Sequence, residues 1–160
     1  MKQVTLYFLV LLTAASCGPV KEKDGRAVQL SDIELYDLTG NAVNPDDYKG
    51  KRIFLNFWAT WCGPCIQEMP SIAAARQILN GKPIEFLLAS DEEMERILKF
   101  TEKKNFDLPF AQVRNMDAFN INALPTTFIF DQDGNLEYTE MGARDWSTEE
   151  ALELITGNKK

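Results

Sequence analysis

Two cysteines separated by Gly-Pro, Cys62 and Cys65, stand between a pattern that predicts a strand and one that predicts a helix. The strand is predicted by a nearly continuous apolar run over residues 53–58, which is typical of a central strand covered on both faces. The helix is predicted by apolar residues at helical spacing from Ile66 to about residue 79, where Asn-Gly ends it. This order constrains the fold strongly, because it places both sulfurs in the first turn of one helix.

That placement favours thiol chemistry. The N-terminus of a helix carries partial positive charge and unpaired N–H groups, so it can lower a cysteine pKa from about 8.5 to about 7 or below. We therefore interpret Cys62 as the nucleophile that attacks a substrate disulfide, and Cys65 as the residue that resolves the mixed disulfide. Gly63 lets a partner backbone come close, and Pro64 falls where the helix has no N–H partner to lose.

A structural zinc site and a purely structural disulfide are the other roles of such a pair. Zinc needs four ligands, whereas the chain has three cysteines and no histidine, so we expect no metal. A structural disulfide stays open, although so short a loop constrains little of the unfolded chain. A Cys-x-x-Cys pair beside a βαβ pattern favours redox activity, in which the disulfide Cys62–Cys65 is itself the redox group and no cofactor is needed.

The start of the chain resembles an export signal. Lys2 gives a minimal positive start, and residues 4–12 form an apolar stretch too short to span a bilayer as a lone helix. Small residues then precede Cys17. We predict a signal peptide over residues 1–16, which is set aside from the fold.

Cys17 resembles a bacterial lipoprotein processing site, at which the cysteine is lipidated and becomes the new N-terminus. The polar residues after it then form a lipid-anchored tether over residues 17–29, which holds the domain at the membrane. Cleavage that leaves a free thiol at Cys17 stays open, since Ala14 stands where the motif usually has leucine.

Residues 30–160 have the length of one domain. The chain is 45% hydrophobic and 26% charged, which is a globular composition, and its formal net charge is −7. An acidic chain without clusters of Lys and Arg lacks the electrostatic footprint of a nucleic-acid-binding protein, so we exclude that partner class.

The other patterns predict a mixed sheet flanked by helices. The expected strands are a β-hairpin over about residues 33–43, a second buried strand over 84–89, a strand after Pro125, and a returning strand over 136–141 that follows a turn over 131–135. One helix ends near residue 104 and is opened by a capping box of Ser90 and Glu93, and a last helix is opened by a capping box of Ser147 and Glu150 and ended by Gly157. Residues 105–119 are expected to be irregular, with a short helix at 116–119.

Polar and aromatic residues surround the cysteine pair in the sequence. Asn56 interrupts the apolar run, and we expect a structural amide satisfied by backbone groups; because it cannot titrate, any proton acceptor comes from elsewhere. Glu68, one turn past Cys65, is expected to be solvated, with tuning of the pair by its charge as the alternative. Trp58 is expected in the core and Trp61 at the surface, where it would form a docking rim for partners.

Taken together, this order of elements resembles the thioredoxin superfamily over about residues 30–157. The phrases Asn-Phe-Trp-Ala-Thr-Trp-Cys-Gly-Pro-Cys at 56–65 and Leu-Pro-Thr-Thr-Phe at 124–128 are similar to the exported, membrane-tethered TlpA/ResA branch. The resemblance implies a thioredoxin-like α/β fold, with a central mixed β-sheet flanked by helices and an added N-terminal β-hairpin. That branch includes thiol-disulfide reductases, some of which serve cytochrome c maturation.

The resemblance also implies roles for single residues. Pro125 would be a cis-proline facing the cysteines, and Leu124 would offer backbone hydrogen bonds to a bound substrate segment. Glu92 would match an acidic residue that influences cysteine protonation; the alternative is an acid that favours a helix N-terminus. The candidate site comprises the catalytic pair Cys62 and Cys65, the supporting residues Trp61, Gly63, Pro64, Glu92, Leu124 and Pro125, and the lipidation site Cys17.

The direction of electron flow follows from the residues between the cysteines. Gly-Pro is thioredoxin's own dipeptide and favours a reductase of protein disulfides. In an oxidising export compartment such as the bacterial periplasm, a reductase needs a membrane electron donor that re-reduces its dithiol. A dithiol oxidase or isomerase, and a non-enzymatic binding module on the same fold, are the alternatives.

Overall fold

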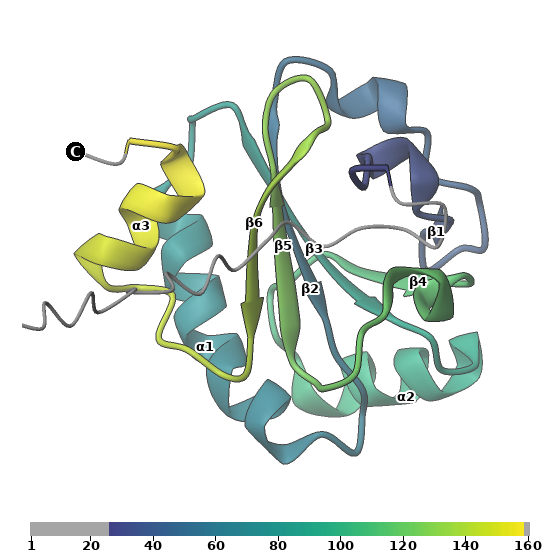
Figure 1. Cartoon of the computed structure of the whole chain (residues 1–160). Helices are drawn as coiled ribbons and strands as arrows, with labels where there is room; N and C mark the ends of the chain where they lie inside the picture. Colours follow the sequence, from purple (N-terminus) through teal and green to yellow (C-terminus); the bar gives the residue numbers. More distant parts are fainter. Residues whose placement is uncertain (1–25, 159–160) are drawn as a thin grey trace, which may run out of the picture.

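A computed structural model describes residues 26–158 of the chain. They form one six-stranded mixed sheet in the order β1-β4-β3-β2-β5-β6, with helices packed around it (Figure 1). The strands are β1 (Leu35–Tyr36), β2 (Arg52–Phe57), β3 (Ile84–Ser90), β4 (Phe110–Val113), β5 (Thr126–Phe130) and β6 (Leu136–Met141). The α-helices are α1 (Gly63–Ile78), α2 (Met94–Lys104) and α3 (Glu149–Thr156), and the 3₁₀ helices are η1 (Leu30–Asp32), η2 (Pro45–Tyr48) and η3 (Met116–Phe119).

The connections explain the layers. The strands β2, β3 and β4 are parallel neighbours, joined in turn by α1 and α2. Both crossovers move the chain in the same direction across the sheet, and because such crossovers are right-handed, both helices lie on the same face. Buried residues of α1, α2 and α3 accordingly belong to one hydrophobic cluster. The other face is covered by a second cluster, to which Val28, Leu30 and Phe119 contribute.

Strand pairing brings three segments to one edge of the sheet. At the end of β2, Phe57 lies opposite Ala89 of β3, which is parallel to it, and opposite Thr126 of β5, which is antiparallel. The carboxyl ends of β2 and β3 therefore meet the beginning of β5. The loops that carry Cys62 and Glu92 start at this edge, and the loop that carries Pro125 ends there.

The predicted mixed sheet with flanking helices is confirmed, and apart from β4 so is the order of its elements from β2 onward. The N-terminal hairpin is present only in a short form: β1 has two residues, Tyr36 bridges Ala42, and the main partner of β1 is β4.

The prediction that residues 105–119 lack a strand is wrong, because β4 lies among them. Its four residues give too short an alternation to be recognised, and they become a strand through parallel pairing of Phe110 with Leu88. Both capping boxes are also wrong by position. Ser90 ends β3 and Glu93 is the N-cap of α2, while Thr148, whose hydroxyl accepts from Ala151 N, caps α3.

The domain includes residues that the sequence assigned to the tether. Val28 is fully buried and its carbonyl accepts a hydrogen bond from Leu136 N, so the last residues of the predicted tether pack on the domain. The predicted signal peptide and Cys17 lie outside the described residues. Within residues 26–158, no helix has both the length and the apolar character needed to cross a membrane.

Candidate active site

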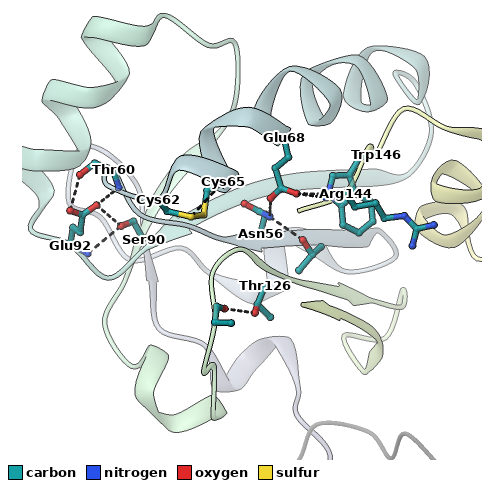
Figure 2. The surroundings of a disulfide bond; sticks show 12 residues. Asn56, Thr60, Cys62, Cys65, Glu68, Ser90, Glu92, Thr126, Arg144 and Trp146 are labelled. Atoms are coloured by element: carbon teal, nitrogen blue, oxygen red, sulfur yellow. Dashed lines mark hydrogen bonds between the residues drawn. A yellow bond between two sulfur atoms is a disulfide. The ribbon is translucent and has the colours of Figure 1, made fainter. Parts of the chain in front are cut away.

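The cysteine pair is located at the start of α1, just after the loop that follows β2. Cys62 is the N-cap of α1, and its Sγ accepts a hydrogen bond from Cys65 N at 3.3 Å. The two sulfurs form a disulfide across this first turn, with Cα atoms 5.3 Å apart (Figure 2). Pro64 lies in the first turn, where its missing N–H leaves no intrahelical bond unmade. The expected position of both sulfurs at the helix start is confirmed.

Both cysteines are buried, Cys62 with 4% and Cys65 with 0% of the residue surface exposed, but exposed residues lie directly next to them. Trp61 is 70% exposed, whereas Trp58 is fully buried and packs against Phe100 with ring centroids 4.7 Å apart, as the sequence predicted. A Cβ added to Gly63 would meet no described atom within 4 Å, apart from its chain neighbours and helix backbone. A partner backbone can therefore approach the disulfide from the side of Trp61 and Gly63.

The Leu124-Pro125 peptide bond is cis, in agreement with the form expected of Pro125. Leu124 is half-buried and contacts both hydrophobic clusters. Since Thr126 pairs with Phe57, these residues lie at the same sheet edge as the cysteine loop. Their contact with a substrate stays a prediction.

Glu68 lies in a different environment from the one that the sequence predicted. It was expected in solvent, but it is only 4% exposed. Its Oε1 accepts from Asn56 Nδ2 at 2.8 Å, and its Oε2 accepts from Arg144 N at 3.1 Å and from Trp146 Nε1 at 3.2 Å (Figure 2). A signal was present in the sequence: Glu68 follows Cys65 by three residues, so it shares the inward face of the helix.

Burial raises the pKa of the Glu68 carboxyl, and this effect exceeds the opposing effect of the hydrogen bonds from Arg144, Asn56 and Trp146, which lower the pKa. The site thus contains a buried carboxyl group one helical turn from Cys65. Such a group can exchange a proton nearer to neutral pH than an exposed glutamate can.

Asn56 is fully buried beside this carboxyl. Its Nδ2 donates to Glu68 and also to Thr127 Oγ1 at 2.9 Å. The expectation that backbone groups satisfy this amide is wrong, because both partners are side chains from other elements.

Glu92 is placed next to the cysteine loop by a different set of bonds. Its carboxylate accepts from Thr60 N at 2.6 Å and from Thr60 Oγ1 at 2.8 Å, and it forms an ion pair with Arg96 at 3.5 Å. The side chain is 7% exposed. Through the hydrogen bonds from Thr60, Glu92 connects the loop before Trp61 to the segment between β3 and α2 (Figure 2). An influence on cysteine protonation stays a prediction.

No group of three or more His, Cys, Asp or Glu side chains within residues 26–158 could hold a metal ion. The reactive groups of the described site are the two sulfurs and the buried carboxyl of Glu68, and the exposed surface at Trp61 and Gly63 lies next to them. A disulfide at the start of a helix, on a mixed sheet with a cis-proline at the adjacent strand, defines a thioredoxin-like protein with a redox-active cysteine pair.

Comparison with known proteins agrees. The Redoxin family model matches residues 23–155, and the chain belongs to this family. It is 30% identical over 168 residues to a thiol-disulfide oxidoreductase ResA of Bacillus cereus, an alignment that covers 96% of this chain and 95% of that protein. It is also 36% identical over 110 residues to ResA of Geobacillus kaustophilus, covering 66% of this chain and 63% of that protein.

Among solved structures, a Bacteroides vulgatus protein proposed to be a thiol-disulfide oxidoreductase matches with a TM-score of 0.70 and 30% identity, covering 90% of this chain and 99% of that one. The expectation of a TlpA/ResA-like member of the thioredoxin superfamily is confirmed, and with it the expectation of thiol-disulfide oxidoreductase activity.

The buried carboxyl of Glu68 predicts a pH-dependent stability. Because its pKa is raised on folding, the folded protein retains a proton that the unfolded chain releases at lower pH. The contribution is most favourable below the ordinary glutamate pKa of about 4.3 and is lost as pH rises through the raised pKa. Glu68→Gln cannot titrate at this position. The free energy of unfolding of the variant minus that of the wild type, measured in urea, should therefore increase as pH rises from acidic to neutral.

Glu34→Gln, which removes one carboxylate at an exposed position, is the matched control. If the two variants follow the same pH dependence relative to the wild type, the carboxyl of Glu68 is not held in a burial-perturbed state.

Proposed function

We propose that this protein reduces disulfide bonds in exported proteins through the dithiol form of Cys62 and Cys65. The observation that carries the proposal is the pair itself, at the N-terminus of α1 and directly after the exposed Trp61. The fold and the family fit an oxidoreductase of either direction. The direction, the compartment and the partners are the proposed part.

The two sulfurs differ in a way that assigns their order. Both cysteines are buried, but Cys62 is the N-cap of α1 and its Sγ receives an N–H hydrogen bond, which stabilises a thiolate, whereas Cys65 lies inside the first turn. The Cys62 thiolate attacks one sulfur of the substrate disulfide, forms a mixed disulfide and expels the other sulfur as a thiolate, which takes up a proton. The Cys65 thiolate then attacks Cys62 Sγ and releases the second substrate sulfur. Two electrons pass from the dithiol to the substrate.

The second attack requires Cys65 to lose its proton. The carboxyl of Glu68, one turn along the same face of α1, is the acceptor we assign, since its raised pKa matches it to this task better than an ordinary glutamate. Asn56 cannot titrate. Glu92 acts in this proposal by holding the loop at Thr60.

The substrate segment lies, in this proposal, between Trp61 and the turn before β5. Gly63 leaves room for its backbone, and Pro64 keeps the first turn of α1 in place. The backbone of Leu124, next to Pro125, offers hydrogen bonds to an extended segment. The substrate class is therefore a protein chain with an accessible disulfide rather than a small molecule.

The cellular setting is proposed from the start of the chain. A signal peptide over residues 1–16 and lipidation at Cys17 would place the domain in the bacterial periplasm as a membrane-anchored lipoprotein. A membrane electron donor would then re-reduce the Cys62–Cys65 disulfide, because the compartment itself is oxidising. Maturation of cytochrome c is the process to which a reductase of this branch would contribute.

The reduction potential of the pair tests the direction of electron flow. For a reductase we expect a value near that of thioredoxin, about −270 mV or lower, and a value near about −120 mV would make the protein an oxidant of thiols instead. The measurement is a redox titration of the full chain against glutathione or dithiothreitol, with Cys17→Ser so that only Cys62 and Cys65 report. Failure of these two residues to form a disulfide would refute the redox role itself.

Trapping of the mixed disulfide tests the order of attack. In the Cys17→Ser background, Cys65→Ser should accumulate a covalent adduct with a disulfide-containing peptide, because the resolving sulfur is absent. Cys62→Ser is the matched control and should accumulate several-fold less, since Cys65 lies inside the first turn and lacks the N-cap position that stabilises a thiolate at Cys62. Mass spectrometry gives the adduct fraction. More adduct in the control would reverse the assignment of nucleophile and resolving residue.

Membrane attachment tests the role of Cys17. Expressed in a bacterium, the full chain should fractionate with membranes and gain the mass of a lipid, whereas Cys17→Ser should lose both properties. Cys65→Ser serves as the control for loss of a cysteine elsewhere. A wild-type chain that stays in the soluble fraction, with an unmodified Cys17, would leave the domain unanchored and contradict this part of the proposal.

A further inference from the structure

We infer that Asn56 accepts a hydrogen bond from the Cys65 thiol in the dithiol state, and that it thereby shifts the redox equilibrium of the pair toward the dithiol. The inference rests on the proposed function and deepens it, because it names a residue outside the Cys-x-x-Cys motif that sets the equilibrium.

The first observation is an acceptor without a donor. Asn56 is fully buried, and its Oδ1 accepts no hydrogen bond from any described residue. The same amide is fully used on its nitrogen, which donates to Glu68 and Thr127. Trp58 Nε1 is a buried donor that also lacks a partner among residues 26–158, so it does not reach this oxygen. Buried amide oxygens are almost always bonded, and an orphan is unfavourable.

The second observation is the direction of the orphan oxygen. The nitrogen of the amide donates to Glu68 Oε1 and to Thr127 Oγ1, so the oxygen of the same amide points elsewhere. Figure 2 shows Asn56 between Glu68 and the disulfide, with its oxygen on the side of the sulfurs. The oxygen of this amide is therefore turned away from the carboxyl that its nitrogen contacts.

The third observation is the register of the two elements. Alternate residues of a strand share a face, so Asn56 lies with Phe54, whose side chain belongs to the cluster that includes α1. Cys65 and Glu68 are three residues apart and share one face of that helix. An amide that reaches Glu68 with its nitrogen therefore has Cys65 as the next position toward the start of the helix.

The chemistry follows from the hydrogen count of the sulfurs. A disulfide carries no proton, so Cys65 can donate nothing to Asn56 in the oxidised form. Reduction adds two electrons and two protons and gives two thiols, and the S–H of Cys65 then becomes a donor. The orphan oxygen is thus present in the disulfide form and satisfied in the dithiol form, which favours reduction.

The exchange equilibrium with glutathione tests the inference. In this reaction the protein disulfide and two glutathione thiols give the protein dithiol and one glutathione disulfide. In the full chain carrying Cys17→Ser, Asn56→Leu removes the acceptor while keeping the branching of the side chain, and it should shift the equilibrium constant about tenfold toward the protein disulfide, equal to about 30 mV. Thr127→Val is the matched control, because it removes a partner of Nδ2 and leaves Oδ1 in place; its shift should stay within about twofold.

A spectroscopic measurement tests the same bond without changing Asn56. In the protein carrying Cys17→Ser and Cys62→Ala, Cys65 holds the only thiol, and its S–H stretching band in the infrared should lie below that of an alkane thiol in an apolar solvent. A band at the frequency of the unbonded thiol would overturn the inference even if Asn56→Leu failed to fold.

The outcomes separate this inference from the proposed function. If the protein with Asn56 intact forms no Cys62–Cys65 disulfide, the redox function fails. If the disulfide forms but Asn56→Leu shifts the exchange constant no more than Thr127→Val, the function stands and the role of Asn56 is refuted.

Discussion

The pairing of β2 on both sides is the constraint on which the rest of this structure depends. β2 is parallel to β3 and antiparallel to β5, so its carboxyl end is fixed between the end of one strand and the start of the other. The chain leaves β2 at this edge and enters α1 after five residues, with Cys62 as the helix N-cap. The pairing of β2 therefore determines where the disulfide lies, and the Cys-x-x-Cys motif determines that it can form.

Behind the disulfide, a small polar network connects three distant parts of the chain. Glu68 receives hydrogen bonds from Asn56 of β2 and from Arg144 and Trp146, which lie between β6 and α3. Such a network is favourable only if its members are paired, and here one oxygen of Asn56 is left over among the described residues. We propose that the protein controls its pair of sulfurs in two ways, through proton exchange at Glu68 and through a hydrogen bond at Asn56 that shifts the redox equilibrium.

Sequence patterns predicted the central strands and the Cys-x-x-Cys helix well, because long apolar runs and helical spacing report burial directly. They failed for β4, which has four residues and becomes a strand through its neighbour β3. They also failed at the helix starts, where Thr148 rather than Ser147 accepts the capping hydrogen bond. At the site, Trp61 and Pro125 were predicted from their motifs. Glu68 was misplaced, because a charged residue on the inward face of a helix looks solvated until its partners are known.

The sequence by itself determined the chemistry of this protein: two cysteines at a helix start, with no histidine in the chain, favour thiol-disulfide exchange whatever surrounds them. Only the tertiary structure decided how that chemistry is controlled. Glu68 and Asn56 are twelve residues apart, and Trp146 is seventy-eight residues beyond Glu68, so no local pattern reveals that they meet. The physical reason is that hydrogen bonding and desolvation, which set the pKa of a carboxyl and the state of an amide, depend on neighbours that folding alone brings together.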